Sequence, residues 1–325
     1  MFRSLRGLLL CTPFVLSACA DDGACTIASV GDLNVLNTQG SPIVKATLNG
    51  HPVALIVDTG AVITSIWPQQ IDRLGLEASS RQVHLRGVGG ETTGTIVTAH
   101  TLGLGSATAS DVSFVSVGTL LDGHMIGDRP IVGLLGADFL SNYDVVFDLP
   151  NHRVNLYDVH GCKGAIPHWT GAYYKVPINH DGWDQTKIIV HVTLNGHGMD
   201  AILDSGAHRT LISTDDAAAA GVRTSDLTGD RKGVGYGIDD EKGTRFLHRF
   251  DSLELGPFRF SNPVLTVGQT DHSLLGAEFF RRHRVWIPRA RDALFVQPVA
   301  PFYREVTPPP PPGGHDATSG RNKPE

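Results

Sequence analysis

The chain has 325 residues, of which 41% are hydrophobic and 18% are charged. This length suggests about two domains, and the composition is that of a folded protein able to build a sizeable core. The net charge of −6 and the lack of a basic cluster in the body of the chain argue against a nucleic acid as the main partner. The 37 glycines, set between short runs of Val, Ile, Thr and Leu, favour an all-β architecture.

Residues 1–19 have the form of a secretory signal. Two arginines precede an apolar run over 8–16, which is too short for an ordinary transmembrane helix and is followed by small residues. Residues 16–19, Leu-Ser-Ala-Cys, resemble a bacterial lipobox, in which Cys19 becomes the lipidated first residue of the mature protein. Ordinary cleavage after Ala20, which fits an A-x-A site, is the alternative.

We therefore expect a bacterial cell-envelope protein that is lipid-anchored at Cys19 and faces the periplasm. Ala20, and not an aspartate, directly follows the cysteine, which favours the outer membrane. The alternative cleavage would leave a secreted or soluble periplasmic protein.

Two further cysteines remain in the mature chain, Cys25 and Cys162. Two cysteines in an exported chain predict a disulfide; two free thiols or intermolecular pairing are the alternatives. The 15 histidines do not occur at His-x-x-x-His spacing and the cysteines do not occur at Cys-x-x-Cys spacing, so no metal site is expected.

The first predicted lobe covers 42–160 and follows an N-terminal segment over 20–41. Two strands, 42–48 and 52–57, flank Asn49-Gly50, a strong hairpin signal. The elements predicted next are a strand at 62–66, a short helix at 68–74, a glycine-rich hairpin at 85–95, strands at 96–104, 112–117 and 132–135, a short helix at 137–140, and strands at 143–148 and 153–157.

The second predicted lobe covers 186–300 and follows a linker at 161–185. It contains an alanine-rich helix that Thr214 or Asp215 caps and that ends at Ala220. The predicted strands are 187–194, 199–203, 210–212, 246–255, 258–267, 285–288 and 293–296. The tail at 301–325 contains five consecutive prolines and is expected to be disordered.

The two lobes are copies of one another. Asn49-Gly50 recurs as Asn195-Gly196, and Asp58 recurs as Asp204, at one common offset (195 − 49 and 204 − 58 are both 146). A lone Asp-Thr-Gly is weak evidence, because an aspartate at such a junction commonly hydrogen-bonds its own turn. Here the loop returns as Asp-Ser-Gly inside a matching frame, and Leu-Leu-Gly-Ala-Asp-Phe at 134–139 returns as Leu-Leu-Gly-Ala-Glu-Phe at 274–279. The repeat indicates two equivalent lobes.

This duplicated set of apolar-Asp-Thr/Ser-Gly-Ala loop, glycine-rich hairpin and apolar-apolar-Gly element resembles the aspartic protease superfamily over about 42–297. The alanine after each glycine resembles the retropepsin type, whereas the fusion of two halves resembles the pepsin layout. The resemblance implies an all-β fold of two homologous β-barrel lobes with an active-site cleft between them. Because both halves lie in one chain, a monomer is expected.

The resemblance also implies roles for particular residues. Asp58 and Asp204 would be the catalytic pair, and Gly136 and Gly276 would pack beneath the two loops. The active-site loop residues are Thr59, Gly60, Ala61, Ser205, Gly206 and Ala207, with Thr59 and Ser205 bracing the loops against each other. The substrate-binding flap residues are Val88, Gly89, Gly90, Gly235, Tyr236 and Gly237, although a plain surface hairpin is the alternative for the first tip.

The implied activity is that of an aspartic endopeptidase, in which the Asp58/Asp204 dyad activates a water. Two carboxylates that share one proton supply a base and an acid in the same step, so no metal or organic cofactor is required. The expected partner is a peptide or protein substrate. The alternative function is that of a non-catalytic cell-envelope lipoprotein that binds peptides, but the presence of both aspartates favours the enzyme.

Overall fold

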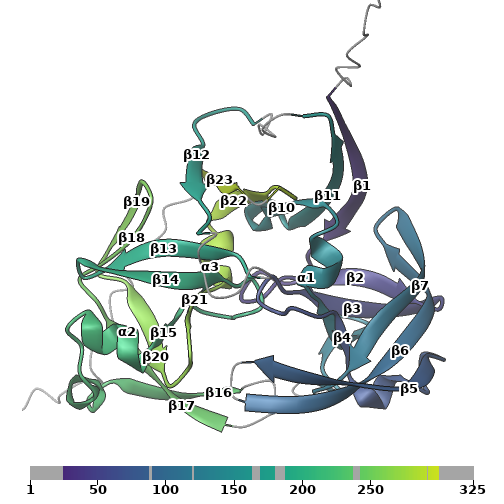
Figure 1. Cartoon of the computed structure of the whole chain (residues 1–325), viewed down its shortest axis with the longest axis horizontal. Coiled ribbons are helices and arrows are strands. Elements are labelled where there is room, and N and C mark those ends of the chain that lie inside the picture. The colour runs from purple at the N-terminus through teal and green to yellow at the C-terminus, as the bar shows by residue number, and fades with distance from the viewer. Residues whose placement is uncertain are drawn as a thin grey trace, which may run out of the picture.

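The computed structural model describes residues 25–87, 90–118, 121–162, 169–179, 187–236, 242–290 and 292–299. Its strands form three sheets, one in each lobe and one that joins the lobes (Figure 1). The all-β, two-lobed architecture predicted from the sequence is confirmed. None of the helices within these ranges is long and apolar enough to span a membrane.

The sheet of the first lobe closes on itself. Its elements are β2 (Ile43–Leu48), β3 (His51–Val57), β4 (Ser65–Ile66), η1 (Pro68–Gln70), β5 (Glu77–Gly87), β6 (Gly90–Leu104), β7 (Ala107–Ser116), β8 (Met125–Ile126), β9 (Arg129–Leu135) and α1 (Ala137–Leu140). The strand order is β2-β3-β9-β4-β7-β6-β5, and β8 pairs with β9. The long strand β6 also pairs with β2, where Thr47 lies opposite Gly103, and this pairing completes a barrel.

The second lobe repeats this arrangement. Its elements are β13 (Ile189–Leu194), β14 (His197–Leu203), β15 (Leu211–Ser213), α2 (Thr214–Ala219), η3 (Thr224–Leu227), β16 (Arg231–Tyr236), β17 (Lys242–Arg249), β18 (Ser252–Leu255), β19 (Phe258–Ser261), β20 (Val264–Gly268), β21 (Ser273–Leu275) and α3 (Ala277–Phe280). The strand order is β16-β17-β20-β15-β21-β14-β13-β18-β19. Residues 250–251 divide the strand equivalent to β6 into β17, which pairs with β20, and β18, which pairs with β13.

A six-stranded sheet joins the lobes. Its elements are β1 (Thr26–Asn34), β10 (Asp144–Asp148), η2 (Leu149–Asn151), β11 (Arg153–His160), β12 (Tyr174–Pro177), β22 (His283–Ile287) and β23 (Ala293–Pro298). The order is β1-β11-β10-β22-β23-β12, so the central pairing of β10 with β22 links the two halves, with Val146 opposite Trp286.

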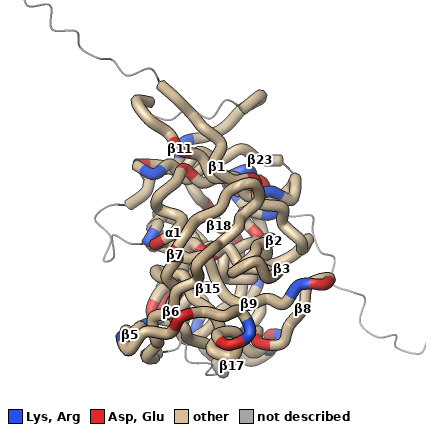
Figure 2. The backbone as a smooth tube through the Cα atoms, turned by 90° about the vertical axis from the view of Figure 1, so that its right-hand side faces the viewer, with Lys and Arg blue, Asp and Glu red and all other residues tan. Residues whose placement is uncertain are grey.

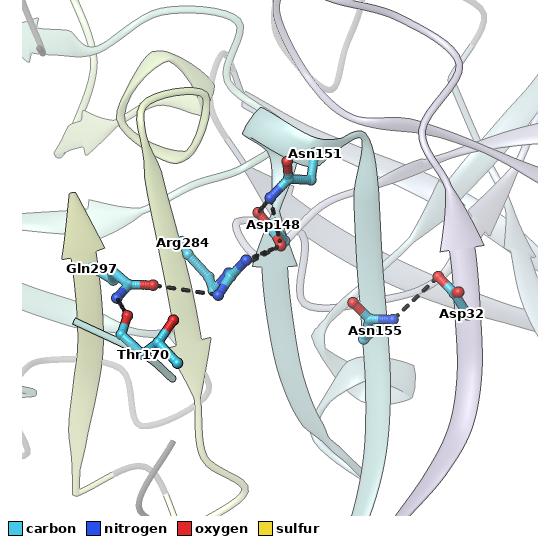
Figure 3. A network of polar contacts seen from close by, with 7 residues as sticks. All are labelled: Asp32, Asp148, Asn151, Asn155, Thr170, Arg284 and Gln297. Carbon is cyan, nitrogen blue, oxygen red and sulfur yellow. Dashed lines mark hydrogen bonds and ion pairs between the residues drawn. The ribbon is translucent and has the colours of Figure 1, made fainter. Parts of the chain in front are cut away.

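Polar and apolar contacts reinforce this central pairing. Arg284 on β22 donates to Asp148 on β10 through Nε (2.9 Å), and its Nη2 lies 2.7 Å from the same carboxylate oxygen (Figure 3). The rings of Phe147 and Phe280, one from each half, lie 4.7 Å apart between centroids. One continuous apolar core therefore extends through both lobes.

The predicted Asn-Gly hairpins are present in both lobes. Asn49 and Asn195 have φ of 48° and 49°, and the glycines that follow them have φ of 81° and 82°. Two successive residues with positive φ form the type I′ turn, whose twist matches that of the flanking strands, which explains the choice of Asn and Gly.

Several predicted elements differ in detail. The strand expected at 62–66 is reduced to β4, because the N–H and the hydroxyl of Thr64 donate to the carboxylate of Asp138 instead of continuing a strand. The helix expected at 68–74 is a single 3₁₀ turn, η1. Ser213, and not Thr214 or Asp215, caps α2, since its hydroxyl accepts the N–H of Asp216. Strands β1 and β12 fall in segments for which no strand was predicted.

Figure 2 marks the charged positions along the backbone. Positions of Lys and Arg and positions of Asp and Glu are interspersed along the described chain in this view.

Candidate active site

Strands β3 and β14 each end directly before an aspartate. The parallel pairing of β3 with β9, and of β14 with β21, holds both strand ends in the protein interior. The pairing continues into the loops, because the N–H of Asp58 donates to the carbonyl of Leu135 (2.9 Å) and that of Asp204 to the carbonyl of Leu275 (2.9 Å). The sequence repeat is thus a structural repeat around the two aspartates.

Each carboxylate is held by its own loop. Oδ1 of Asp58 accepts the N–H groups of Gly60 (2.8 Å) and Ala61 (2.9 Å). Oδ1 of Asp204 accepts those of Gly206 (2.8 Å) and Ala207 (2.9 Å). Both loops therefore fix one oxygen of the carboxylate by two main-chain donors.

Each carboxyl group also packs on the glycine of the opposite loop. A Cβ at Gly60 would lie 2.3 Å from Cγ of Asp204, and one at Gly206 would lie 2.1 Å from Cγ of Asp58. The absence of side chains here lets the two carboxyl groups lie side by side, close enough for each to affect the pKa of the other. Two carboxyl groups this close do not both ionise readily, so the arrangement favours a state in which they hold one proton between them.

The hydroxyl residues after the aspartates tie the loops together. The N–H of Thr59 donates to Oγ of Ser205 (3.0 Å), and the N–H of Ser205 donates to Oγ1 of Thr59 (2.9 Å). The two hydroxyls in turn donate to carbonyls of the opposite lobe, Thr59 to Leu203 (2.7 Å) and Ser205 to Val57 (2.7 Å). Both side chains are buried, so all these groups are paired away from water.

Gly136 and Gly276 lie beneath the loops, at the starts of α1 and α3. Their N–H groups donate to the hydroxyls of Thr64 (3.0 Å) and Thr210 (3.2 Å). A Cβ at Gly136 would lie 2.6 Å from the main chain of Ile63, so only glycine permits this approach.

A family model described as aspartyl protease matches residues 44–139 and 190–279, which is more than half of the chain. The chain belongs to the aspartyl protease family. Each matched segment contains one of the two aspartate loops. Among solved structures, an aspartic proteinase from Irpex lacteus is similar with a TM-score of 0.51, 17% sequence identity, and coverage of 84% of this chain and 98% of that one. At this level of identity, the likeness shows the fold alone.

Burial raises the pKa of both carboxyl groups in this aspartyl protease. For Asp204 the negative charge of Asp58 adds to burial and raises the pKa to about 8. For Asp58, the main-chain N–H of Ala61, the Asp204 carboxyl group and the N–H of Gly60 act against burial, and the positive charge of Lys187 adds a smaller contribution in the same direction. The pair therefore loses its protons in two separate steps and holds one proton between them, as the aspartic-protease dyad does in the standard description of this effect.

Two hairpins extend from the lobes toward each other along one side of the molecule (Figure 1). In the first, Gly87 pairs with Gly90, which begins β6; in the second, Tyr236, next to Gly235 at the end of β16, pairs with Lys242. The predicted tip residues Val88, Gly89 and Gly237 lie outside the described residues. Arg86, near the first tip, lies 3.6 Å from Asp271 of the second lobe, so this hairpin reaches across to the other lobe.

The predicted disulfide is present between Cys25 and Cys162, which are 137 positions apart. It fastens the start of β1 to the chain beyond β11. Cys19 and the rest of the signal region lie outside the described residues. Within the part of the chain that the structure describes, no three His, Cys, Asp or Glu side chains gather as metal ligands would.

Two residues beside the loops were missed by the sequence analysis. Oγ of Ser41 donates to the carbonyl of Gly206 (2.6 Å), and Nζ of Lys187 donates to the carbonyl of Gly60. Ser41 and Lys187 are also 146 positions apart, so the repeat that relates Asp58 to Asp204 would have identified them as equivalent positions.

Proposed function

We propose that this aspartyl protease is an endopeptidase whose Asp58/Asp204 pair activates a water for peptide hydrolysis. The single observation that carries the proposal is the close approach of the Asp58 and Asp204 carboxyl groups, each packed on the glycine of the opposite loop. A lone carboxylate cannot take a proton from water and give one to the carbonyl oxygen in the same step, whereas a singly protonated pair can.

The main-chain donors around the pair support this role. Each carboxylate keeps one oxygen bound to two N–H groups of its own loop, which leaves the other oxygen for the partner and the water. The substrate would lie between the lobes, with the hairpins that end at residues 87–90 and 236–242 as flaps over it. The tip residues Val88, Gly89 and Gly237 belong to this proposal as well.

The test is hydrolysis of a mixed peptide library by the mature protein, followed by mass spectrometry with and without pepstatin. We expect internal cleavage that pepstatin suppresses and that is absent in Asp58→Asn. Binding of peptides by the wild type without any cleavage would instead favour a non-catalytic, peptide-binding lipoprotein.

For the location we propose a lipid anchor at Cys19 and a place in the cell envelope, facing the periplasm. The lipobox-like Leu-Ser-Ala-Cys at 16–19 supports it. Cys19→Ser should abolish labelling by a radioactive fatty acid and release the protein from the membrane fraction, whereas Cys11→Ser, within the signal, should change neither. Labelling that survives in Cys19→Ser would exclude this anchor and favour the soluble periplasmic form.

A further inference from the structure

Lys187 and Ser41 occupy equivalent places in the two halves but bring different groups to the active-site loops. They are separated by the same 146 positions as Asp58 and Asp204. Each side chain crosses to the loop of the other lobe, where Ser41 donates to the carbonyl of Gly206 and Lys187 to the carbonyl of Gly60. Both side chains donate a hydrogen bond, but only Lys187 brings a positive charge to the carbonyl that it bonds.

That charge lies beside the carboxyl pair. The carbonyl of Gly60 accepts a hydrogen bond from the Lys187 ammonium, and the N–H of the same glycine donates to Oδ1 of Asp58. Lys187 is half-buried, so solvent screens its field less than it would screen that of a surface lysine. Its charge favours the ionised form of Asp58. At the equivalent place beside the Asp204 loop stands a neutral serine hydroxyl.

We propose that Lys187 makes the pair asymmetric, holding Asp58 as the ionised general base and leaving the shared proton on Asp204, the general acid. This inference rests on the proposed function. The Asp58 carboxylate takes a proton from water as the water oxygen attacks the peptide carbon, while Asp204 gives its proton to the carbonyl oxygen. On collapse, Asp58 passes its proton to the leaving nitrogen as the C–N bond breaks, and Asp204 recovers a proton from the diol.

Of the cations near the two loops, Lys187 acts on the pKa of Asp58, whereas the pKa of Asp204 is set by burial, by Asp58 and by its own loop. His272, in the loop before β21, lies within electrostatic reach of Lys187, Asp271, Asp216 and Arg86, and burial lowers its pKa, which disfavours a second positive charge beside Lys187. Two cations lie on the Ser41 side, Arg209 and Arg281, and their charges act on His208. Arg281 is held by the carbonyls of Gly40 (3.0 Å) and Asn37 (2.9 Å).

The serine at the equivalent position in the first half suggests the variant that tests the role of the Lys187 charge. Lys187→Ser copies the hydroxyl of Ser41, so it keeps a donor near the carbonyl of Gly60 and removes the charge alone. Lys187→Arg keeps the charge. Lys175→Ser is the matched control, because Lys175 is exposed on β12 and pairs with Asp292 on the surface.

Two measurements are made on the three variants. The first is the pH profile of kcat/KM, in which Lys187→Ser should move the acid limb upward by about one pH unit, the size expected for loss of a nearby opposite charge. Lys187→Arg and Lys175→Ser should leave that limb in place. The second is a ¹³C-carboxyl NMR titration in the Asp204→Asn and Asp58→Asn backgrounds, where the remaining aspartate titrates alone. Adding Lys187→Ser should raise the pKa of Asp58 by about one unit and that of Asp204 by clearly less.

Equal shifts of the two aspartates, no shift of Asp58, or a shift in Lys187→Arg as large as in Lys187→Ser would each overturn the role of Lys187. The titration does not depend on turnover. If the wild type cleaves no peptide, the proposed function fails, and the NMR result still decides whether Lys187 sets the charge on Asp58.

Discussion

Thr59 and Ser205, which lie 146 positions apart, each accept the main-chain N–H of the other. This reciprocal pair joins the two lobes at the point where the carboxyl groups meet. Its geometry explains why the loops carry a hydroxyl residue at this place, since a residue without a side-chain oxygen would leave a buried N–H and a buried carbonyl unpaired.

Removing either hydroxyl should therefore destabilise the protein. For Thr59→Val and Ser205→Ala we expect a loss of about 1–3 kcal/mol in the free energy of unfolding, measured by urea denaturation. Thr228→Val is the control, because its hydroxyl bonds the carbonyl of Ser225 at the exposed surface and should matter by less than about 0.5 kcal/mol. An equal effect in all three variants would contradict the bracing role.

Neutralising either aspartate should remove activity but not the fold. We expect Asp58→Asn and Asp204→Asn to lower kcat/KM by at least about 100-fold, because the shared proton and the base are both required. Since burial raises the folded-state pKa of Asp204 to about 8, its charge costs stability above pH 4. Asp204→Asn should thus unfold at higher urea than the wild type near pH 8, with the difference vanishing near pH 4.

Substantial turnover in either asparagine variant would contradict the paired mechanism. A stability gain that is the same at pH 8 and pH 4 would contradict the electrostatic origin of the cost.

The sequence predicted the loops well because they are local and repeated. Asp58 and Asp204 follow apolar strands in the same frame, and the type I′ turns at Asn49 and Asn195 need no tertiary information. The predicted capping residue of α2, Thr214 or Asp215, lay one or two positions past the observed one, since Ser213, Thr214 and Asp215 are all good caps and tertiary contacts decide between them. Ser213 is the cap in the structure, and its N–H is bound by Ser273 from another strand.

What the sequence could not show depends on pairing between distant segments. Strands β1 and β12 lie at the edges of the sheet that joins the lobes, and their order follows from contacts with β11 and β23. Lys187 shows the same limit for the site. Lysine is a common residue, and only the hydrogen bond from its ammonium to the carbonyl of Gly60 identifies Lys187 as part of the site.

The ion pair at the centre of the joining sheet should contribute more to stability than pairs on the surface. Asp148 and Arg284 are largely buried, with side chains 11% and 25% exposed (Figure 3). Asp148→Ala leaves the guanidinium without its carboxylate, and we expect a loss of about 2–3 kcal/mol in the free energy of unfolding. Asp292→Ala, which breaks the exposed pair with Lys175, should cost less than about 1 kcal/mol. Comparable losses in the two variants would show that burial does not increase the contribution of the Asp148–Arg284 pair to stability.

His283 should make the protein less stable in acid. Burial lowers its pKa to about 4. Its Nδ1 lies 2.8 Å from the carbonyl oxygen of Phe279, and its ring packs against the side chains of Phe258, Phe260 and Phe279. The unfolded chain binds the proton from about pH 6.5 downward and the folded chain does not, so the contribution of His283 to stability falls between pH 6.5 and 4. This fall amounts to about 3 kcal/mol at pH 4, and the difference in urea midpoint between the wild type and His283→Phe across this range measures it. The difference should grow in favour of His283→Phe as the pH falls, and the exposed His51→Phe should show no such trend; a difference that does not change with pH would contradict the assignment.

The alanines after the two glycines should set the pH range of activity. The N–H of Ala61 and that of Ala207 each bond a carboxylate, so a hydroxyl on either residue would stand beside the carboxyl pair. A donor to the ionised form lowers a pKa, and alanine supplies none from its side chain. We therefore expect a bell-shaped pH profile in mildly acidic conditions for the wild type, and a shift to lower pH in Ala61→Ser/Ala207→Ser. Each single serine variant should move the profile by part of that shift, measured as kcat/KM on one peptide. An unmoved or upward-shifted profile in the double variant would show that the missing hydroxyls do not control the pair.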